Sequence, residues 1–482
     1  MAVDATPGFD LQPSGQQVAL ASNYITNFDF LNQYLPDTYE KEFERYGNRT
    51  VASFLRMVGA EMPSNSDLIK WAEQGRLHTK YTACTTVAAA AATNGVWTIP
   101  TAQVQPGAPA STMPVNGFAA IRTGQTVMIS DETAGSTLSN KGIVTAVSTA
   151  AAFTITVAYY EGGGQTMAAA VNCSIFVYGS EFQKGTVGMA NSIESQDFIF
   201  ENSPIIIKDT YEVSGSDMAQ IGWVEITTEN GGSGYLWYLK SEHETRLRFE
   251  DYLETAMVEA VPAEAGSGAI NTGGVNPNFG QKGSEGVFYV VNTRGNVWSG
   301  GNPVALAGFD SVIQRLDKQG AIEENVIFCN RDFSFDIDDM LAAQNSYGAG
   351  GTSYGLFDND EEMALNLGFT GFRRGYDFYK SDWKYLNDPT MRGGLTGGKI
   401  NGLLVPAGST TVYDQILGKN AKRPFLHVRY RASETEDRRY KTWITGSAGG
   451  ARTSDLDAMT VNFLSERAVC TLGANNFFLF RD

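Results

Sequence analysis

Cysteine and histidine are scarce in this chain of 482 residues, which contains four cysteines and three histidines. The seven residues are scattered along the sequence: Cys84, Cys173, Cys329, Cys470, His78, His243 and His427. No two cysteines form a C-x-x-C pair, which argues against a disulfide framework and against a zinc site. The pattern therefore predicts no metal and no cofactor, and it favours folding in a reducing cytosol.

Long apolar runs are also lacking, because no stretch of 18 apolar residues occurs anywhere in the chain. The first residues, 1–7, contain neither a basic segment nor an apolar core. We therefore expect neither a membrane span nor a secretory signal peptide.

The chain contains few charged residues, and fewer of them are basic than acidic. Charged residues make up 18% of the chain, below the usual ~25%, and the net charge is −17. The low charge favours a subunit that buries much of its surface against copies of itself; a β-rich secreted monomer is the alternative. The acidic balance argues against reading or wrapping nucleic acid, since neutralising phosphates requires clustered Lys and Arg. An acidic wall repels a DNA duplex and lets it slide, which suits a container.

Catalytic motifs are missing. The nearest match is the run Gly393–Lys399, which has the Gly-x4-Gly-Lys spacing of a phosphate-binding loop. That loop requires Ser or Thr next and then a helix, whereas Ile400 follows here and the continuation is typical of a strand. We expect no catalytic or cofactor-binding residues and no enzymatic activity. A hydrolase of unrecognised family is the alternative, because any acidic protein contains candidate carboxylate pairs.

The length predicts about three folded units, and the 52 glycines indicate a loop-rich, β-leaning architecture. Residues 82–178 are rich in Ala, Thr, Val and Gly and nearly free of Lys and Arg. Their short β-type runs predict a small β-barrel or sandwich inserted into a longer chain. The runs are 121–130, 142–147, 153–157 and 173–178.

Helical patterns are fewer. Asn65–Gln74 has a capping residue before a short amphipathic stretch, which predicts a helix. The clearest helix covers 235–261, ends before Pro262, and carries an apolar stripe at i, i+3, i+4, i+7, i+8 and i+11. The stripe consists of Phe249, Tyr252, Leu253, Ala256, Met257 and Ala260. An ordinary core helix is the alternative to a long spine.

Further along the chain, the sequence predicts helices at 305–318 and 336–344. It also predicts strands at 205–213, 286–291, 326–328, 399–406, 440–444, 468–472 and 476–480.

Basic residues are concentrated in one segment, residues 419–441. They are Lys419, Lys422, Arg423, Arg429, Arg431, Arg438, Arg439 and Lys441. In so acidic a chain, we expect them to contact an acidic surface of a neighbouring copy, where complementary charge sets register. A solvated loop face is the alternative. On the interface hypothesis, reversing Arg438 and Arg439 to Glu blocks particle formation and leaves the subunit folded.

The order of these elements resembles the HK97-type fold of major capsid proteins of tailed double-stranded DNA bacteriophages. This resemblance implies an α+β fold with an N-terminal arm at 1–60 and an E-loop at 61–80 and 179–232, interrupted by the all-β insertion 81–178. It also implies a peripheral domain at 233–300 and 456–482, with the spine helix 235–261, and an axial domain at 301–455. The sequences of Ser192–Asp197 and Leu464–Arg481 are similar to those of capsid proteins from crAss-like gut phages and related podoviruses.

The resemblance implies a virion protein that assembles in the host bacterial cytoplasm as hexamers and pentamers into an icosahedral shell around the phage DNA. Implied partners are other copies of the chain, a separate scaffold, a portal and auxiliary or decoration proteins. The packaged DNA would lie nearby without specific recognition, and no membrane is involved. Two alternatives remain: an encapsulin-like protein compartment, and a virion decoration or fibre-type binding protein.

Overall fold

A computed structural model describes residues 60–76, 78, 80–86, 94–100, 119–148, 153–161, 172–190, 197–219, 226–227, 233–234, 237–264, 267–269, 281–345, 370–414, 419–450 and 452–482. The predicted arm, apart from residue 60, lies outside these residues. The chain divides into two compact units, residues 70–201 and the remainder, and each is described by itself. Sheets dominate and helices are few, so the chain is of mixed α+β class.

The unit 70–201 contains a closed barrel of six strands in the order β3-β4-β7-β6-β5-β8. The strands are β3 Lys80–Thr86, β4 Asn94–Thr98, β5 Gln125–Asp131, β6 Ser139–Ser148, β7 Thr154–Tyr159 and β8 Cys173–Ser180. Alternate residues fill the interior wherever the strands are regular, because successive side chains of a strand point to opposite faces. Val127, Ile155 and Ile175 are fully buried there around the Trp97 ring.

Outside the barrel, β2 (Ile69–Gln74) pairs with β9 (Asp197–Asn202) in a two-stranded ribbon. The predicted helix at Asn65–Gln74 is therefore wrong. Near the start of this segment, the Ser66 hydroxyl donates to the Leu68 carbonyl (2.9 Å) and accepts from the Leu68 amide (3.3 Å). This local turn competes with helix formation, and the following residues extend into β2.

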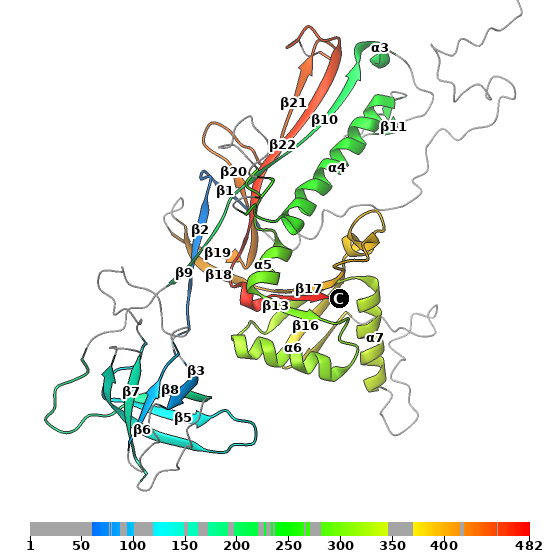
Figure 1. Cartoon of the computed structure of the whole chain (residues 1–482). Helices are drawn as coiled ribbons and strands as arrows, with labels where there is room; N and C mark the ends of the chain where they lie inside the picture. Colours follow the sequence, from blue (N-terminus) through cyan, green and yellow to red (C-terminus); the bar gives the residue numbers. More distant parts are fainter. Residues whose placement is uncertain are drawn as a thin grey trace, which may run out of the picture. The chain divides into compact units, whose positions relative to one another are not determined.

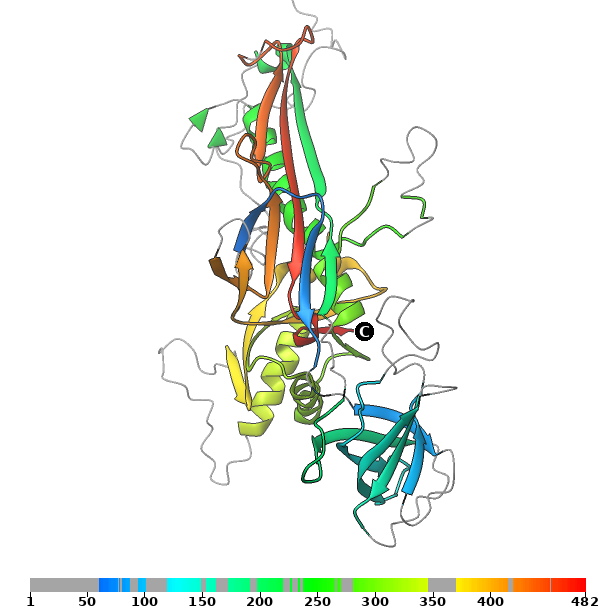
Figure 2. The same ribbon diagram turned by 90° about the vertical axis from the view of Figure 1, so that its left-hand side faces the viewer.

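The remaining unit is built around a long sheet in the order β1-β20-β22-β10, with β21 also paired to β22. Its strands are β1 Ala60–Ser64, β10 Ile205–Ser214, β20 Leu426–Arg431, β21 Lys441–Gly446 and β22 Ala458–Thr471. In Figure 2, β22 runs between β10 on one side and β21 on the other.

The helix α4 (Trp237–Glu259) confirms the predicted long helix and runs alongside β10 and β22 (Figure 1). Phe249 and Leu253 are buried against Phe463 and its neighbours on β22. Phe249 stacks on Phe463 at a ring-centroid distance of 5.6 Å and contacts the Tyr440 ring edge-on at 5.5 Å.

The buried face of α4 is rotated relative to the predicted stripe. Met257 is buried, and Ala256 and Ala260 are half-buried, but Tyr252 is 45% exposed, which corrects its predicted packing. At 100° per residue, Tyr252 lies on the side of Phe249 away from Leu253 and Met257. The sheet contacts the helix on the Leu253 side, so the Tyr252 ring faces outward.

A second, six-stranded sheet in the same unit has the order β13-β23-β17-β14-β16-β15. Its strands are β13 Asn296–Ser299, β14 Glu324–Cys329, β15 Gly371–Arg374, β16 Tyr376–Asp382, β17 Ile400–Pro406 and β23 Phe478–Arg481. Three helices accompany it: α5 Val287–Arg294, α6 Leu306–Gln319 and α7 Arg331–Asn345.

The two faces of this sheet belong to different cores. Leu404 packs with α6 and α7, whereas its neighbours Leu403 and Val405 pack with α5 and with residues of the long sheet. Strand alternation explains the division, because Leu404 points to the opposite face from Leu403 and Val405. One shared core therefore joins the two sheets.

Shorter elements complete the described chain. They are α3 Gly215–Met218, β11 Ile226–Thr227, β12 Ser233–Gly234, β18 Ser409–Asp414, β19 Lys419–Pro424, η3 Lys384–Leu386, η4 Arg392–Gly394 and η5 Ala474–Asn476.

The predicted strand 286–291 is wrong, because α5 occupies this segment. Val287, Phe288, Val290 and Val291 are all buried, and an apolar run without periodicity does not distinguish a buried strand from a buried helix. Gly286 precedes the helix, where an added Cβ would lie 2.6 Å from the Ala260 carbonyl oxygen. This close approach requires glycine.

Strand pairing also departs from the predicted domain boundaries. β20 and β21, from the segment expected to be axial, pair with β22 in the long sheet, and so does β10, from the expected E-loop. β13 and β23, from the expected peripheral domain, instead pair in the six-stranded sheet. These pairings join segments that are distant in the sequence and share no local signal.

Two residues of α4 give a direct test of its packing. We expect Phe249→Ala to lower the free energy of unfolding by about 3–5 kcal/mol, since it opens a cavity beneath α4. Tyr252→Ala, on the exposed side, should change it by less than about 0.5 kcal/mol. Urea unfolding of both variants measures the difference, and equal effects would contradict the packing.

Candidate functional site

The basic segment predicted as a contact surface is spread over three strands and a loop. Lys419, Lys422 and Arg423 belong to β19, and their side chains lie outside the described part of the structure. Arg429 and Arg431 belong to β20, and Arg438, Arg439 and Lys441 lie in the connection to β21 and at its start.

Described side chains of this segment form ion pairs within the chain. The Arg438 guanidinium lies 2.7 Å from Glu466, and the Lys441 ammonium lies 2.8 Å from Glu436. Arg439 pairs with Glu61 of β1, and Arg431 pairs with Asp67. The hydrogen bond and positive charge of Lys441 hold the pKa of the Glu436 carboxyl below its usual range.

Two charged residues of β22 are buried at the centre of this network. Glu466 is 8% exposed and Arg467 is 6% exposed. Arg467 donates to the Ser465 hydroxyl (2.9 Å) and to the Arg439 carbonyl (3.1 Å), and its guanidinium lies 3.3 Å from Glu61. Buried charges are tolerated only when they are paired and hydrogen-bonded, so these contacts are required by the fold. We call Glu61, Arg438, Arg439, Glu466 and Arg467 the charged seam.

The sequence could not identify the acidic partners of the basic segment. Glu61 lies 378 residues before Arg439 in the chain, and the parallel pairing of β1 with β20 brings them together. Contact of the basic segment with a neighbouring copy stays a prediction. The intramolecular pairs change the expected result of charge reversal, because a Glu at position 438 would face the buried Glu466.

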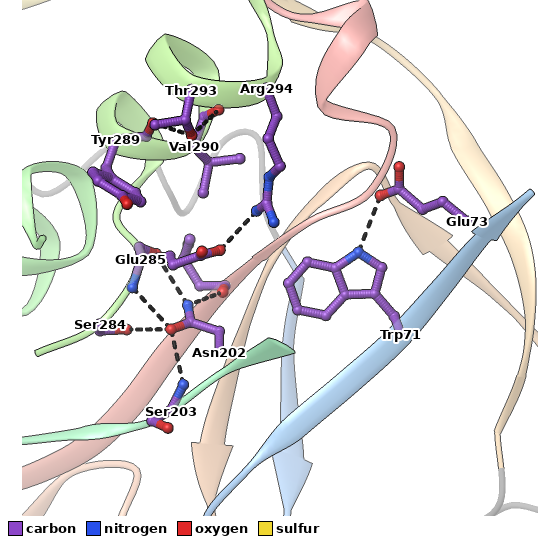
Figure 3. A network of polar contacts seen from close by, with 11 residues as sticks. Trp71, Glu73, Asn202, Ser203, Ser284, Glu285, Tyr289, Val290, Thr293 and Arg294 are labelled. Carbon is purple, nitrogen blue, oxygen red and sulfur yellow. Dashed lines mark hydrogen bonds and ion pairs between the residues drawn. The ribbon is translucent and has the colours of Figure 1, made fainter. Parts of the chain in front are cut away.

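A buried asparagine that the sequence did not single out joins three segments (Figure 3). Asn202, 4% exposed, donates to the Val469 carbonyl of β22 (2.7 Å) and to the Glu285 carbonyl (3.0 Å). Its side-chain oxygen accepts from the Ser203 amide (2.9 Å), the Glu285 amide (2.8 Å) and the Ser284 hydroxyl (3.0 Å). Every hydrogen-bonding group of this amide side chain is used.

Asn202 therefore fixes the start of β10 to β22 and to the segment that leads into α5. The Arg294 guanidinium at the end of α5 lies 2.7 Å from Glu285 and supports the same segment. The only sequence signal is the turn-forming run Asn202-Ser203-Pro204, which does not reveal a buried network.

The β2–β9 ribbon exposes large apolar side chains. Phe198 is 62% exposed and Ile199 is 69% exposed, and as neighbours on one strand they point to opposite faces. The Trp71 ring lies 6.3 Å from Phe200, centroid to centroid, and its indole N–H donates to Glu73 (Figure 3). Lys70 and Glu201 form a salt bridge of 3.0 Å across the ribbon.

The glycine-rich run Gly393–Lys399 does not form a phosphate cradle. It leads directly into the strand β17, as the sequence predicts, and not into a helix. Arg392 donates to the Gly398 carbonyl (2.9 Å) and pairs with Glu259 of α4 (2.9 Å), so the run is held against α4. Among the described residues, no cluster of three or more His, Cys, Asp or Glu side chains is arranged to bind a metal ion. No helix in the described ranges is long and apolar enough to cross a membrane.

The chain is similar to known proteins in structure but not detectably in sequence. No protein-family model and no curated sequence matches the chain. A structure from Microbacterium phage Oxtober96 aligns over 95% of this chain and 99% of its own, with a TM-score of 0.39 and 9% identity.

Two further similar structures are those of capsids. The capsid of a native GTA particle aligns over 97% of this chain and 99% of its own (TM-score 0.36, 9% identity). The mature capsid of bacteriophage PhiM1 aligns over 63% and 78% (TM-score 0.32, 10% identity). All three TM-scores are below 0.5, so no inference rests on them.

The charged seam yields a test of subunit stability. We expect Arg438→Glu to lower the free energy of unfolding by about 3 kcal/mol, because it leaves the buried Glu466 without a cation and adds a like charge. The exposed Arg452 provides the matched control, and Arg452→Glu should change stability by less than about 0.5 kcal/mol. Equal unfolding midpoints for the two variants would show that the pair contributes nothing.

Proposed function

We propose that this chain is the major capsid protein of a tailed double-stranded DNA bacteriophage. In this proposal it assembles as hexamers and pentamers into an icosahedral shell, and enclosure of the genome is its whole activity. The fold is then of HK97 type, with α4 as the spine helix, the β2–β9 ribbon as the end of the E-loop and the barrel as an inserted domain. A separate scaffold, a portal and decoration proteins are its expected partners.

The observation that carries the proposal is the exposed β2–β9 ribbon. A two-stranded ribbon is marginally stable in water by itself, and this one exposes Phe198 and Ile199 on its two faces. Burying one such side chain contributes about 1.5–3 kcal/mol. A ribbon of this kind is best explained by neighbours that cover both of its faces, as they do in a closed shell of repeated subunits.

Charge supports the same proposal. The seam satisfies the buried charges of each subunit, while Arg439 and Lys441 remain 55% and 43% exposed at its edge. We propose that these outer cations and their neighbours in 419–441 meet the acidic surface of the next copy. Contacts of this kind fix register more than they add affinity.

The ribbon gives the test. We expect Phe198→Asp to abolish particles, or to raise the concentration needed for assembly at least tenfold, because a carboxylate would be buried at each subunit contact. Phe198→Tyr keeps the ring and should assemble normally. Sedimentation and electron microscopy measure the particles, and thermal unfolding checks that each subunit folds.

Normal shells from a folded Phe198→Asp subunit would contradict the ribbon contact. Two other outcomes favour the alternatives. Wild-type shells that contain protein cargo and no DNA would indicate an encapsulin-like compartment. A wild-type chain that remains a stable monomer or trimer would indicate a decoration or fibre-type protein.

A further inference from the structure

Two of the four cysteines lie directly opposite each other in the barrel. Cys84 on β3 and Cys173 on β8 are register partners in an antiparallel pair. Both thiols are free, and both residues are completely buried in the barrel core. β3 and β8 are the first and last strands of the barrel, and their pairing closes it.

A bulge in β3 brings Cys84 to this position. In a regular strand, Tyr81 and Cys84 would point to opposite faces, yet both are buried and Thr82 and Ala83 between them are exposed. The register shifts between Tyr81 and Cys84, and Ala83 has a φ of 53°. It is the only non-glycine residue with positive φ in the described ranges. This extra residue turns the Cys84 side chain back into the interior.

The register of the two residues is compatible with the span of a disulfide. Residues directly opposite in an antiparallel pair have Cα atoms about 4.5–5.5 Å apart, and disulfides span about 4.4–6.8 Å. We propose that Cys84 and Cys173 are a disulfide-forming pair, which glutathione disulfide or a similar disulfide oxidant converts into a cross-strand bond closing the barrel. This site is independent of the proposed capsid function.

The reaction is two successive thiol–disulfide exchanges. The thiolate of one cysteine attacks a sulfur of glutathione disulfide, forms a mixed disulfide and releases one glutathione thiolate. The second cysteine thiolate then attacks the protein sulfur of the mixed disulfide and releases the second glutathione. The protein pair loses two electrons and two protons, and glutathione disulfide takes up both to give two glutathione thiols.

Burial makes this reaction slow in the folded barrel. It raises the pKa of the Cys84 thiol to about 12 and that of Cys173 to about 11, so the reactive thiolate is rare at neutral pH. A subunit that folds in a reducing compartment therefore keeps both thiols. The bond forms after transfer to an oxidising medium, as the barrel opens transiently.

The other two cysteines provide an internal control. Cys329 on β14 lies opposite Asp382 and Gly402, and Cys470 on β22 lies opposite His427. They are buried in different sheets of the other unit, and neither has a cysteine as register partner. Folding should oppose a disulfide between them.

The experiment compares disulfide formation in the folded and unfolded chain. The full chain with Cys329→Ala and Cys470→Ala is equilibrated in glutathione redox buffers, with and without concentrated urea, starting from both the reduced and the oxidised protein. Mass spectrometry measures the disulfide fraction. Since folding and bond formation are linked reciprocally, we expect the native chain to be half-oxidised at a buffer at least about tenfold more reducing than the chain in urea.

The proposal would be overturned if the native chain became half-oxidised in the same buffer as the chain in urea, or only in a more oxidising one. In the control chain with Cys84→Ala and Cys173→Ala, folding should not favour a disulfide between Cys329 and Cys470. Its native form should therefore become half-oxidised in the same buffer as its urea form, or in a more oxidising one. The wild-type chain, with the bonded peptides identified after digestion, gives the same readout without depending on how well either variant folds.

Discussion

The buried strand β22 is the element on which the rest of the structure depends. Nearly all of its 14 residues are buried, and it pairs with β10 along one edge and with β20 and β21 along the other. A strand buried on both faces must satisfy every polar group that it carries. The ion pairs of Glu466 and Arg467 satisfy its two buried charges, and Asn202 donates to the Val469 carbonyl. These contacts set the positions of β1, the 432–440 loop and the segment before α5.

Local patterns in the sequence predict the regular elements well. The helix α4, the strand β17 and the strands β5 to β8 appear where periodicity and composition place them. The failures have physical causes: Ser66 forms a local turn where a helix was expected to begin, and the first turn of α5 is apolar without a helical period. Glu61 reaches Arg439 through the pairing of β1 with β20, and Glu285 reaches Asn202 through a side-chain hydrogen bond 83 residues apart in the chain. No local pattern encodes them, so the site was predicted only as a basic segment without its acidic half.

The main unit and the β2–β9 ribbon differ in how far their apolar side chains are covered. The two sheets share one core, and the buried charges of the charged seam are paired within the chain. The ribbon differs, because Phe198 and Ile199 remain in water unless another surface covers them. Exposed apolar surface on a protein of low charge is typical of an interaction site. This contrast between a buried, internally paired core and an exposed ribbon supports the proposed shell function.

If copies of this chain tile into a closed shell, electron cryomicroscopy can visualise it in particles purified after co-expression with a scaffold protein. We expect closed icosahedral particles in which each β2–β9 ribbon is covered by an adjacent subunit. Particles in which the ribbon faces solvent, or a preparation that contains only dispersed subunits, would contradict the proposed shell.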